Sequence, residues 1–251
     1  VGGDVNINAG KSSVGGDVNI NAGKSIADGG TTGGMIVLHT GESTLTSSGK
    51  LSIGTPNAGT TGVSGTIDIG SGTSSAGGTG SISMTSGKST GGKGGTITLS
   101  VGDGDTGVGG DVNINAGKSI ADDGTTGGMI VLHAGESALT SSGKLSIGTP
   151  NAGTTGISGT IDIISGTSSA GGTGSISMTS GKSTGGKGGT ITLSVGDGDT
   201  GVGGDVNINA GKTSASNTQG GAVMLSSGAS TQGTSGKAVS YTHLRAHETR
   251  L

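Results

Sequence analysis

Residues 191–211 read ITLSVGDGDTGVGGDVNINAG and contain, twice, the pattern on which the fold prediction rests. In each copy two large apolar residues flank one polar residue, as ITL at 191–193 and VNI at 206–208. This alternation is typical of a β-strand, whose successive side chains point to opposite faces. The Gly-rich sequence between the pairs disfavours helix, at about 1 kcal/mol for each Gly relative to Ala.

The same unit recurs fifteen times along the chain, at steps of 13 to 18 residues, most often 15. Its first large apolar residue falls at positions 5, 18, 36, 51, 67, 82, 97, 112, 130, 145, 161, 176, 191, 206 and 223, and a second follows two residues later each time. Six units form a 94-residue super-repeat, present as residues 14–107 and 108–201, which differ at five positions. Residues 1–13 and 202–238 are partial repeats, so residues 1–238 are predicted to form a single repeat domain.

These repeats predict a regular all-β architecture. One unit holds too few large side chains to fold alone, whereas stacked identical units form continuous apolar ladders and pair their backbones. The sequence therefore predicts a parallel β-solenoid (β-helix) with coils of about 15 residues, or alternatively of about 30. The shorter coil places smaller residues inward in the second half of each unit, namely Leu45, Ala76, Thr106 and Val108. Disorder is the competing interpretation, because the chain has 61 Gly and only 27% hydrophobic residues.

Composition excludes several classes of protein and of partner. Cys, Phe and Trp do not occur, which excludes a disulfide scaffold and a core built on aromatic anchors. A net charge of -3 offers no basic surface for nucleic acid. The longest apolar run, residues 35–38, is far too short to span a membrane. The sequence has no Asn-x-Ser/Thr sequon, although its many hydroxyls are acceptors for O-linked sugars.

The C-terminal end differs sharply in composition from the repeats. Residues 239–249 read VSYTHLRAHET and resemble the translation of a transposase sequencing adapter. We therefore expect residues 239–251 to be foreign to the repeat, the sequence to come from an environmental or transcriptome assembly, and the natural chain to continue beyond residue 238. The only Tyr, both Arg residues and two of the four His fall in this tail, and they are left out of the functional interpretation.

A family resemblance supports an extracellular setting. Residues 193–228, LSVGDGDTGVGGDVNINAGKTSASNTQGGAVMLSSG, resemble the Gly/Ser/Thr-rich tandem repeats of secreted proteins of diatoms and related algae. The GGDV-I-AG phrasing is also similar to repeats in phage tail-fibre stalks. The resemblance covers essentially residues 1–238 and implies a repeat architecture at the cell surface or outside the cell. It brings no catalytic residue with it.

Two recurring motifs have an ordinary structural interpretation beside a functional one. GKS or GKT occurs six times, but a phosphate-binding loop needs a Gly five residues earlier, where this chain has Val or Ile. A solvated turn is therefore the expected structure. His39 and His133 occupy equivalent positions, three residues before Glu42 and Glu136. They lie a full super-repeat apart, too far to share a metal ion, so each is expected to be a surface residue.

The recurring segment GDGDTGVGGD contains the candidate metal ligands. Carboxylates on a Gly-rich turn are hard oxygen ligands of the kind that Ca²⁺ binds, so Ca²⁺ is the one cofactor that the sequence suggests. The segment lacks the closing Glu of an EF-hand and departs from the nonapeptide Ca²⁺ repeat, which favours a charged solubilising turn instead. The candidate ligands are Asp103, Asp105 and Asp111 in one super-repeat and Asp197, Asp199 and Asp205 after it.

The function expected from the sequence is that of a structural or adhesive extracellular rod, a cell-surface, matrix or filament segment without catalysis. Polysaccharide, matrix or ice surfaces are the expected partners, with self-association through the solenoid ends as a further expectation. The alternatives are a surface-binding module for ice or polysaccharide and a phage-type fibre stalk. Ice binding requires a flat hydroxyl array, and the local row Thr96, Thr98 and Ser100 is interrupted in neighbouring units by charged residues such as Asp68 and Asp111.

Overall fold

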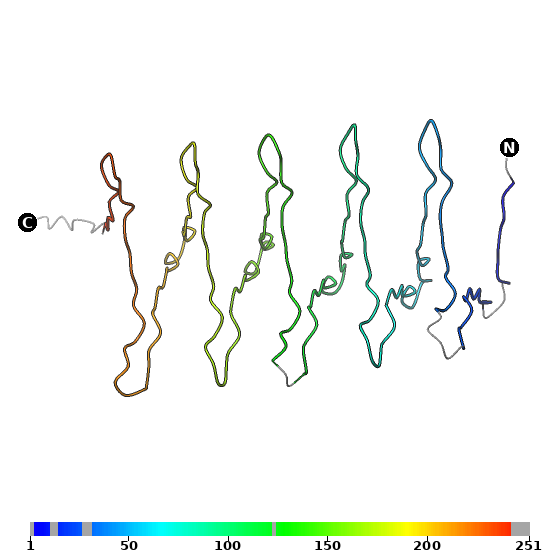
Figure 1. The fold of residues 1–251 in the computed structure, drawn as a ribbon, viewed down its shortest axis with the longest axis horizontal. Helices are drawn as coiled ribbons and strands as arrows, with labels where there is room; N and C mark the ends of the chain where they lie inside the picture. The colour runs from blue at the N-terminus through cyan, green and yellow to red at the C-terminus, as the bar shows by residue number, and fades with distance from the viewer. Residues whose placement is uncertain (1–2, 11–14, 27–31, 122–123, 242–251) are drawn as a thin grey trace, which may run out of the picture. The chain divides into compact units, whose positions relative to one another are not determined.

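The computed structural model of the chain describes residues 3–10, 15–26, 32–121 and 124–241. None of these residues belongs to a helix or a strand; the ribbon runs through straight segments, turns and closed loops (Figure 1). The predicted all-β parallel β-solenoid (β-helix), with coils of 15 or of 30 residues, is therefore wrong. The repeat is real, but its units do not pair their backbones into a sheet.

The chain divides into two compact units, Val1–Met129 and Ile130–Leu251. Each is described here by itself, and both show the same local structure. The boundary falls inside a repeated unit, where the sequence gives no sign of a linker. The single repeat domain over residues 1–238 stays a prediction.

No residue in the described part of the chain is buried, whether apolar or polar. The chain of 23.2 kDa exposes 25182 Å² of surface. A compact protein of this mass exposes about 9,700 Å², and its fully unfolded chain about 34,000 Å². The protein thus buries little more than about a third of the surface that a globular fold would bury, and its described residues do not assemble a hydrophobic core.

Each unit contains a segment of constant length, which we call the constant segment. It has seven residues: a Gly, any residue, the first apolar residue, any residue, the second apolar residue, any residue, and finally Ala, Ser, Thr or Val. Residues 95–101, GTITLSV, and 204–210, GDVNINA, are examples. The fifteen constant segments begin at Gly3, Gly16, Gly34, Gly49, Gly65, Gly80, Gly95, Gly110, Gly128, Gly143, Gly159, Gly174, Gly189, Gly204 and Gly221.

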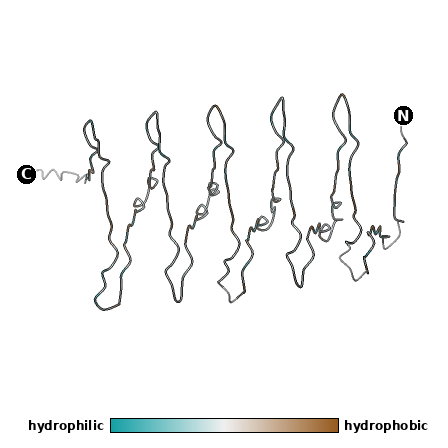
Figure 2. Ribbon diagram, in the orientation of Figure 1, coloured by the Kyte–Doolittle hydropathy of each residue, from teal (hydrophilic) through white to brown (hydrophobic). Residues whose placement is uncertain are grey.

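The two apolar positions of the constant segment differ in exposure from each other and from the rest of the chain. Apart from Val5 near the N-terminus, the first position is 48–57% exposed, whereas the second is 61–78% exposed. Apolar residues between the constant segments are almost fully exposed, including Leu45 at 93% and Val108 at 96%. These two residues were predicted to point inward, and that prediction is wrong. Figure 2 shows the hydropathy of the residues along the ribbon.

Between constant segments the chain forms a loop whose two ends come into contact, and we call this contact a neck. On one side is the last residue of a constant segment or the residue after it. On the other side is the Gly that opens the next constant segment. In one type of neck, backbone groups meet: Gly34 N–H donates to the Gly23 carbonyl oxygen at 2.8 Å. In a second type a hydroxyl closes the neck: Ser86 Oγ donates to the Gly95 carbonyl oxygen at 3.0 Å. In a third type, as at Val101 and Gly110, the side chain of the last residue lies against the Gly without a hydrogen bond. Both kinds of hydrogen bond occur at the neck between Thr40 and Gly49. The Thr40 Oγ1 donates to the Gly49 carbonyl oxygen, and the Gly49 N–H donates to the Gly41 carbonyl oxygen.

The loops outside the necks absorb all the variation in step length. The constant segment always has seven residues, and the intervening loop has between 6 and 11, most often 8. Many loops are turned by a serine whose Oγ accepts the N–H three residues later, as Ser74 does from Gly77 at 3.0 Å and Ser230 from Gly233 at 2.8 Å. Such side-chain bonds replace the backbone bond of a turn. Gly62 and Gly156 occupy equivalent loop positions with φ of 119° and 133°, a region that favours glycine.

The last neck decides how the repeat ends. Gly236 N–H donates to Gly228 O at 2.9 Å, as in the other necks. A further constant segment would therefore begin at Gly236 and place Ala238 and Ser240 at the two apolar positions. Val239 and Tyr241 are 59% and 83% exposed and fall outside the pattern. The predicted foreign tail begins at this point, and residues 242–251 lie outside the described residues.

Replacing Gly34 by Ala is expected to open its neck. A Cβ at residue 34 would lie 2.9 Å from Gly23 N, closer than real Cβ atoms approach backbone, and a tight 3.1 Å from the Ala22 Cβ. The adjacent Gly33→Ala is the matched control, because its Cβ would meet only Gly23 O at an ordinary 3.5 Å. NMR on ¹⁵N-labelled protein measures how the chemical shift of the residue-34 amide proton changes with temperature. We expect this temperature coefficient to become that of an amide bonded to solvent in Gly34→Ala, and to stay unchanged in Gly33→Ala. Equal coefficients in both variants would contradict the neck.

Candidate functional site

The six candidate calcium ligands are exposed, and they lie in two different parts of the repeat. Asp103 and Asp105 belong to the loop after Val101, where Gly104 approaches the Gly107 carbonyl so closely that a Cβ would lie 2.7 Å from its oxygen. Asp111 belongs instead to the following constant segment. In the second set, Asp197 and Asp199 likewise lie in a loop and Asp205 in the constant segment after it. Within the described residues no group of three or more His, Asp or Glu side chains is close enough together to hold a metal ion.

Because the structure does not bring the three carboxylates of either set together, the calcium hypothesis stays a prediction from sequence alone. Binding to an ordered form would change the conformation of the loops, since Ca²⁺ takes six to eight oxygen ligands. Far-UV circular dichroism in Ca²⁺ and in chelator measures this directly. Identical spectra would remove the hypothesis.

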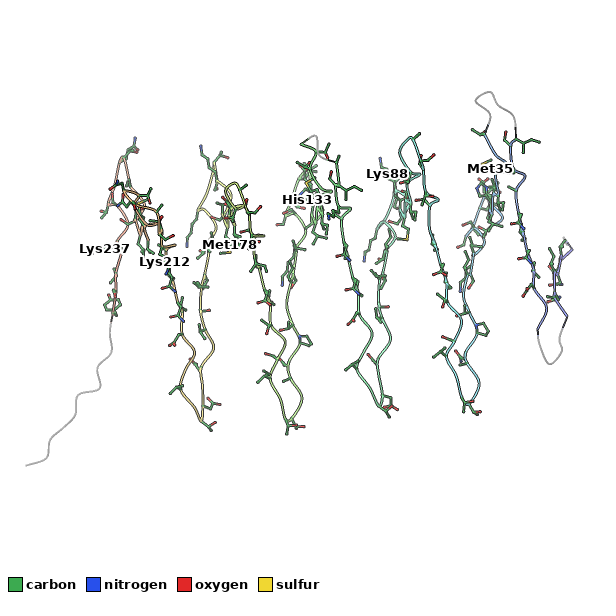
Figure 3. The ribbon with its side chains drawn as sticks, turned by 90° about the horizontal axis from the view of Figure 1, so that it is seen from below. Met35, Lys88, His133, Met178, Lys212 and Lys237 are labelled. Carbon is green, nitrogen blue, oxygen red and sulfur yellow. The ribbon has the colours of Figure 1, made fainter. Side chains whose placement is uncertain are left out.

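The two described histidines lie in constant segments, one in each compact unit. His39 and His133 each precede the last residue of their segment and are exposed (Figure 3, where His133 is labelled). The neighbouring neck residue differs between the copies: Thr40 donates a hydroxyl hydrogen bond that its counterpart Ala134 has no atom to make. Their predicted role as surface residues agrees with this exposure.

The recurring GK dipeptides mark the place where the chain leaves a neck. The carbonyl oxygens of Gly23, Gly117 and Gly211 accept the neck hydrogen bond, each at 2.8 Å, and the Lys that follows begins the loop. A phosphate-binding loop uses free backbone N–H groups at a helix N-terminus, and the described residues include no helix. The Gly of these motifs is therefore explained by loop closure, whereas the Lys is not required for it, since Glu or Ala follows Gly41, Gly135 and Gly228 in equivalent necks.

The hydroxyl row Thr96, Thr98 and Ser100 is exposed within one constant segment. Because the described residues contain no strand, no sheet holds such rows flat and side by side. A regular array of the kind that matches an ice surface is thus not formed by this arrangement. Self-association through solenoid ends also has no counterpart, since the described residues form no solenoid coil.

The necks are the feature that the interpretation of the sequence missed. Their signal was present in two places, the Gly two residues before every first apolar residue and the small residue four positions after it.

Comparison of the chain with protein-family models, with curated proteins and with solved structures gives no match. Within its described residues the chain has no helix of a length and apolarity that could cross a membrane.

Proposed function

We propose that this chain is a structural and adhesive segment of an extracellular matrix or cell surface, without catalysis. Its repeated units act by presenting many similar, weakly binding surfaces along one chain. Polysaccharide is the partner class that the exposed hydroxyl and amide groups suit best. The single observation that supports this proposal most directly is the absence of any buried residue in the described part of the chain.

Catalysis requires functional groups that are held rigidly and shielded from water. A described chain in which no polar or charged residue is buried offers no such environment. Adhesion requires the opposite, namely accessible groups repeated many times. Each exposed loop and constant segment contributes one weak contact, and linked contacts strengthen one another through effective concentration.

Removing one super-repeat tests this multivalent mechanism. Deleting residues 108–201 joins Gly107 to Val202, and this junction reproduces the natural Gly107–Val108 and Gly201–Val202 sequences. All loops and necks that remain keep their sequence, so only the number of contacts falls. We expect the shortened chain to bind insoluble cellulose or chitin about tenfold more weakly than the full chain, because avidity depends steeply on valency.

Co-sedimentation of each chain with the two polysaccharides measures the binding. A full chain that stays in the supernatant with both would contradict polysaccharide adhesion. Equal retention of the full and shortened chains would show that one local site, rather than repetition, carries the binding. A thermal-hysteresis measurement on the same samples tests ice binding, for which the structure offers no flat array.

A further inference from the structure

The constant segments contain most of the exposed large apolar side chains in the described part of the chain. Fifteen pairs of large apolar side chains recur at fixed positions, and in every pair except that of Val5 the first is about half exposed and the second about two-thirds exposed. No described residue covers them fully. Apolar surface of this extent on a soluble chain marks a binding surface.

The backbone of the constant segments is also largely without partners. In the described residues, the backbone–backbone hydrogen bonds are those that close necks, such as Gly128 N–H to Gly117 O and Gly143 N–H to Gly135 O. Within the constant segments these bonds involve only the opening Gly, in six of the fifteen segments. The groups at the two apolar positions, for example Ile97 and Leu99, have no backbone bond to another part of the chain.

We propose that the constant segments bind the constant segments of a second copy of this chain. The proposal rests on the structural role proposed above and names one partner for it. In the complex, apolar pairs of one copy cover apolar pairs of the other, while the necks and loops remain at the margins of the contact.

The repeat itself identifies a second copy as the occupant. Every constant segment has seven residues with its apolar pair at the third and fifth positions, so a second chain presents matching pairs at matching intervals. The super-repeats 14–107 and 108–201 differ at only five positions, which extends this match over most of the chain. An unrelated partner would match this chain along its length only if it had apolar pairs at the same irregular sequence intervals.

The available area is sufficient for a stable contact. A large aliphatic side chain that is half to two-thirds exposed offers about 60 Å² of apolar surface. Thirty such side chains offer on the order of 1,800 Å² in each chain, and a stable interface needs about 800 Å² from each partner. Fewer than half of the pairs therefore have to be in contact at one time.

Charge opposes the pairing of like copies only weakly. In the first super-repeat the constant segments contain three charged residues, Asp17, Lys50 and Asp68, and the second repeats them. Asp4 and Asp205 lie in the constant segments of the partial repeats, and the remaining charged residues before residue 239 lie outside the constant segments. The fifteen constant segments of one chain therefore hold six Asp and two Lys, a net charge of -4 that is spread thinly along the proposed contact.

Sedimentation velocity of the full chain, from about 1 to about 200 μM, tests the proposal. The informative variant is Ile97→Asp with Ile191→Asp, which places a charge at the same first apolar position in both super-repeats. The matched control is Val108→Asp with Val202→Asp, which adds the same two charges in loops where the side chains are 96% and 97% exposed. Neither variant removes a buried residue, so a failure to fold does not confuse the result.

We expect the unsubstituted chain to associate reversibly, and the Ile97/Ile191 variant to need at least about tenfold higher concentration for the same association. The loop variant should associate like the unsubstituted chain, and raising NaCl from about 0.05 to about 0.5 M should not weaken association, because apolar contacts are not screened. A chain that remains monomeric throughout, an equal effect of both variants, or dissociation by salt would each overturn the proposal. A monomer that still binds polysaccharide would leave the proposed adhesive function standing while the second copy is excluded.

Discussion

Dilute solutions of this protein are expected to show no cooperative heat-unfolding transition. Heat uptake on unfolding follows the surface that becomes exposed, and this chain already exposes 25182 Å² of the roughly 34,000 Å² of its unfolded form. A globular protein of this length absorbs about 175 kcal/mol at its midpoint. Differential scanning calorimetry below the concentration of self-association should instead give a nearly flat trace.

The variant Ile97→Asp is the control for this expectation. In a solenoid, a carboxylate at position 97 would be buried without a partner, at a cost of several kcal/mol by order of magnitude. In the structure Ile97 is 57% exposed, so the charge stays in water and the dilute monomer should give the same calorimetric trace and the same far-UV circular dichroism. A sharp heat-absorption peak that Ile97→Asp abolishes would restore a buried apolar stack and contradict the structure.

The sequence predicted the unit of the structure correctly but not its folding. The apolar pairs, such as Ile191 and Leu193, do form a distinct environment, since they are less exposed than the apolar residues of the loops. Alternation over three residues also occurs in a straight segment without a partner, so it does not by itself predict a sheet. With two large side chains in seven residues and no aromatic ring in the repeats, the apolar contacts available are too few to offset the conformational entropy of so many Gly.

The candidate site illustrates a similar limit. Asp103, Asp105 and Asp111 are close in sequence, but a neck separates the third from the first two. Val101, the last residue of one constant segment, lies against Gly110, the first of the next, so the loop closes before Asp111 is reached. Proximity in sequence predicted a cluster because the position of the neck was not recognised. Recognising the Gly at the start and the small residue at the end of each constant segment would have placed Asp111 outside the loop.

An engineered disulfide is expected to form readily across the last neck. In the variant Ser227→Cys/Gly236→Cys, the two Cβ atoms would be 3.7 Å apart, within the range of about 3.5–4.5 Å that a disulfide requires. The backbone bond from Gly236 N–H to Gly228 O is kept, since neither substitution removes its atoms. The chain has no Cys of its own, so this pair is the only one that can form within a molecule.

The matched control moves both cysteines by one residue, to Gly228→Cys/Lys237→Cys. Its loop has the same length, so the entropy of closure in a random chain is the same. A Cβ at Gly228 meets no other atom within 4 Å, however, so it lies farther from the Lys237 Cβ than the mean separation of about 3.8 Å in a disulfide. Against a glutathione buffer, the neck pair should be oxidised about tenfold more favourably, equivalent to a reduction potential about 30 mV lower. In concentrated guanidinium the two pairs should become equal, because the difference comes from the neck and not from the length of the loop. Equal potentials in native buffer would mean that the closed loops are not populated in solution, and the division into constant segments and loops would then describe the sequence but not the folded chain.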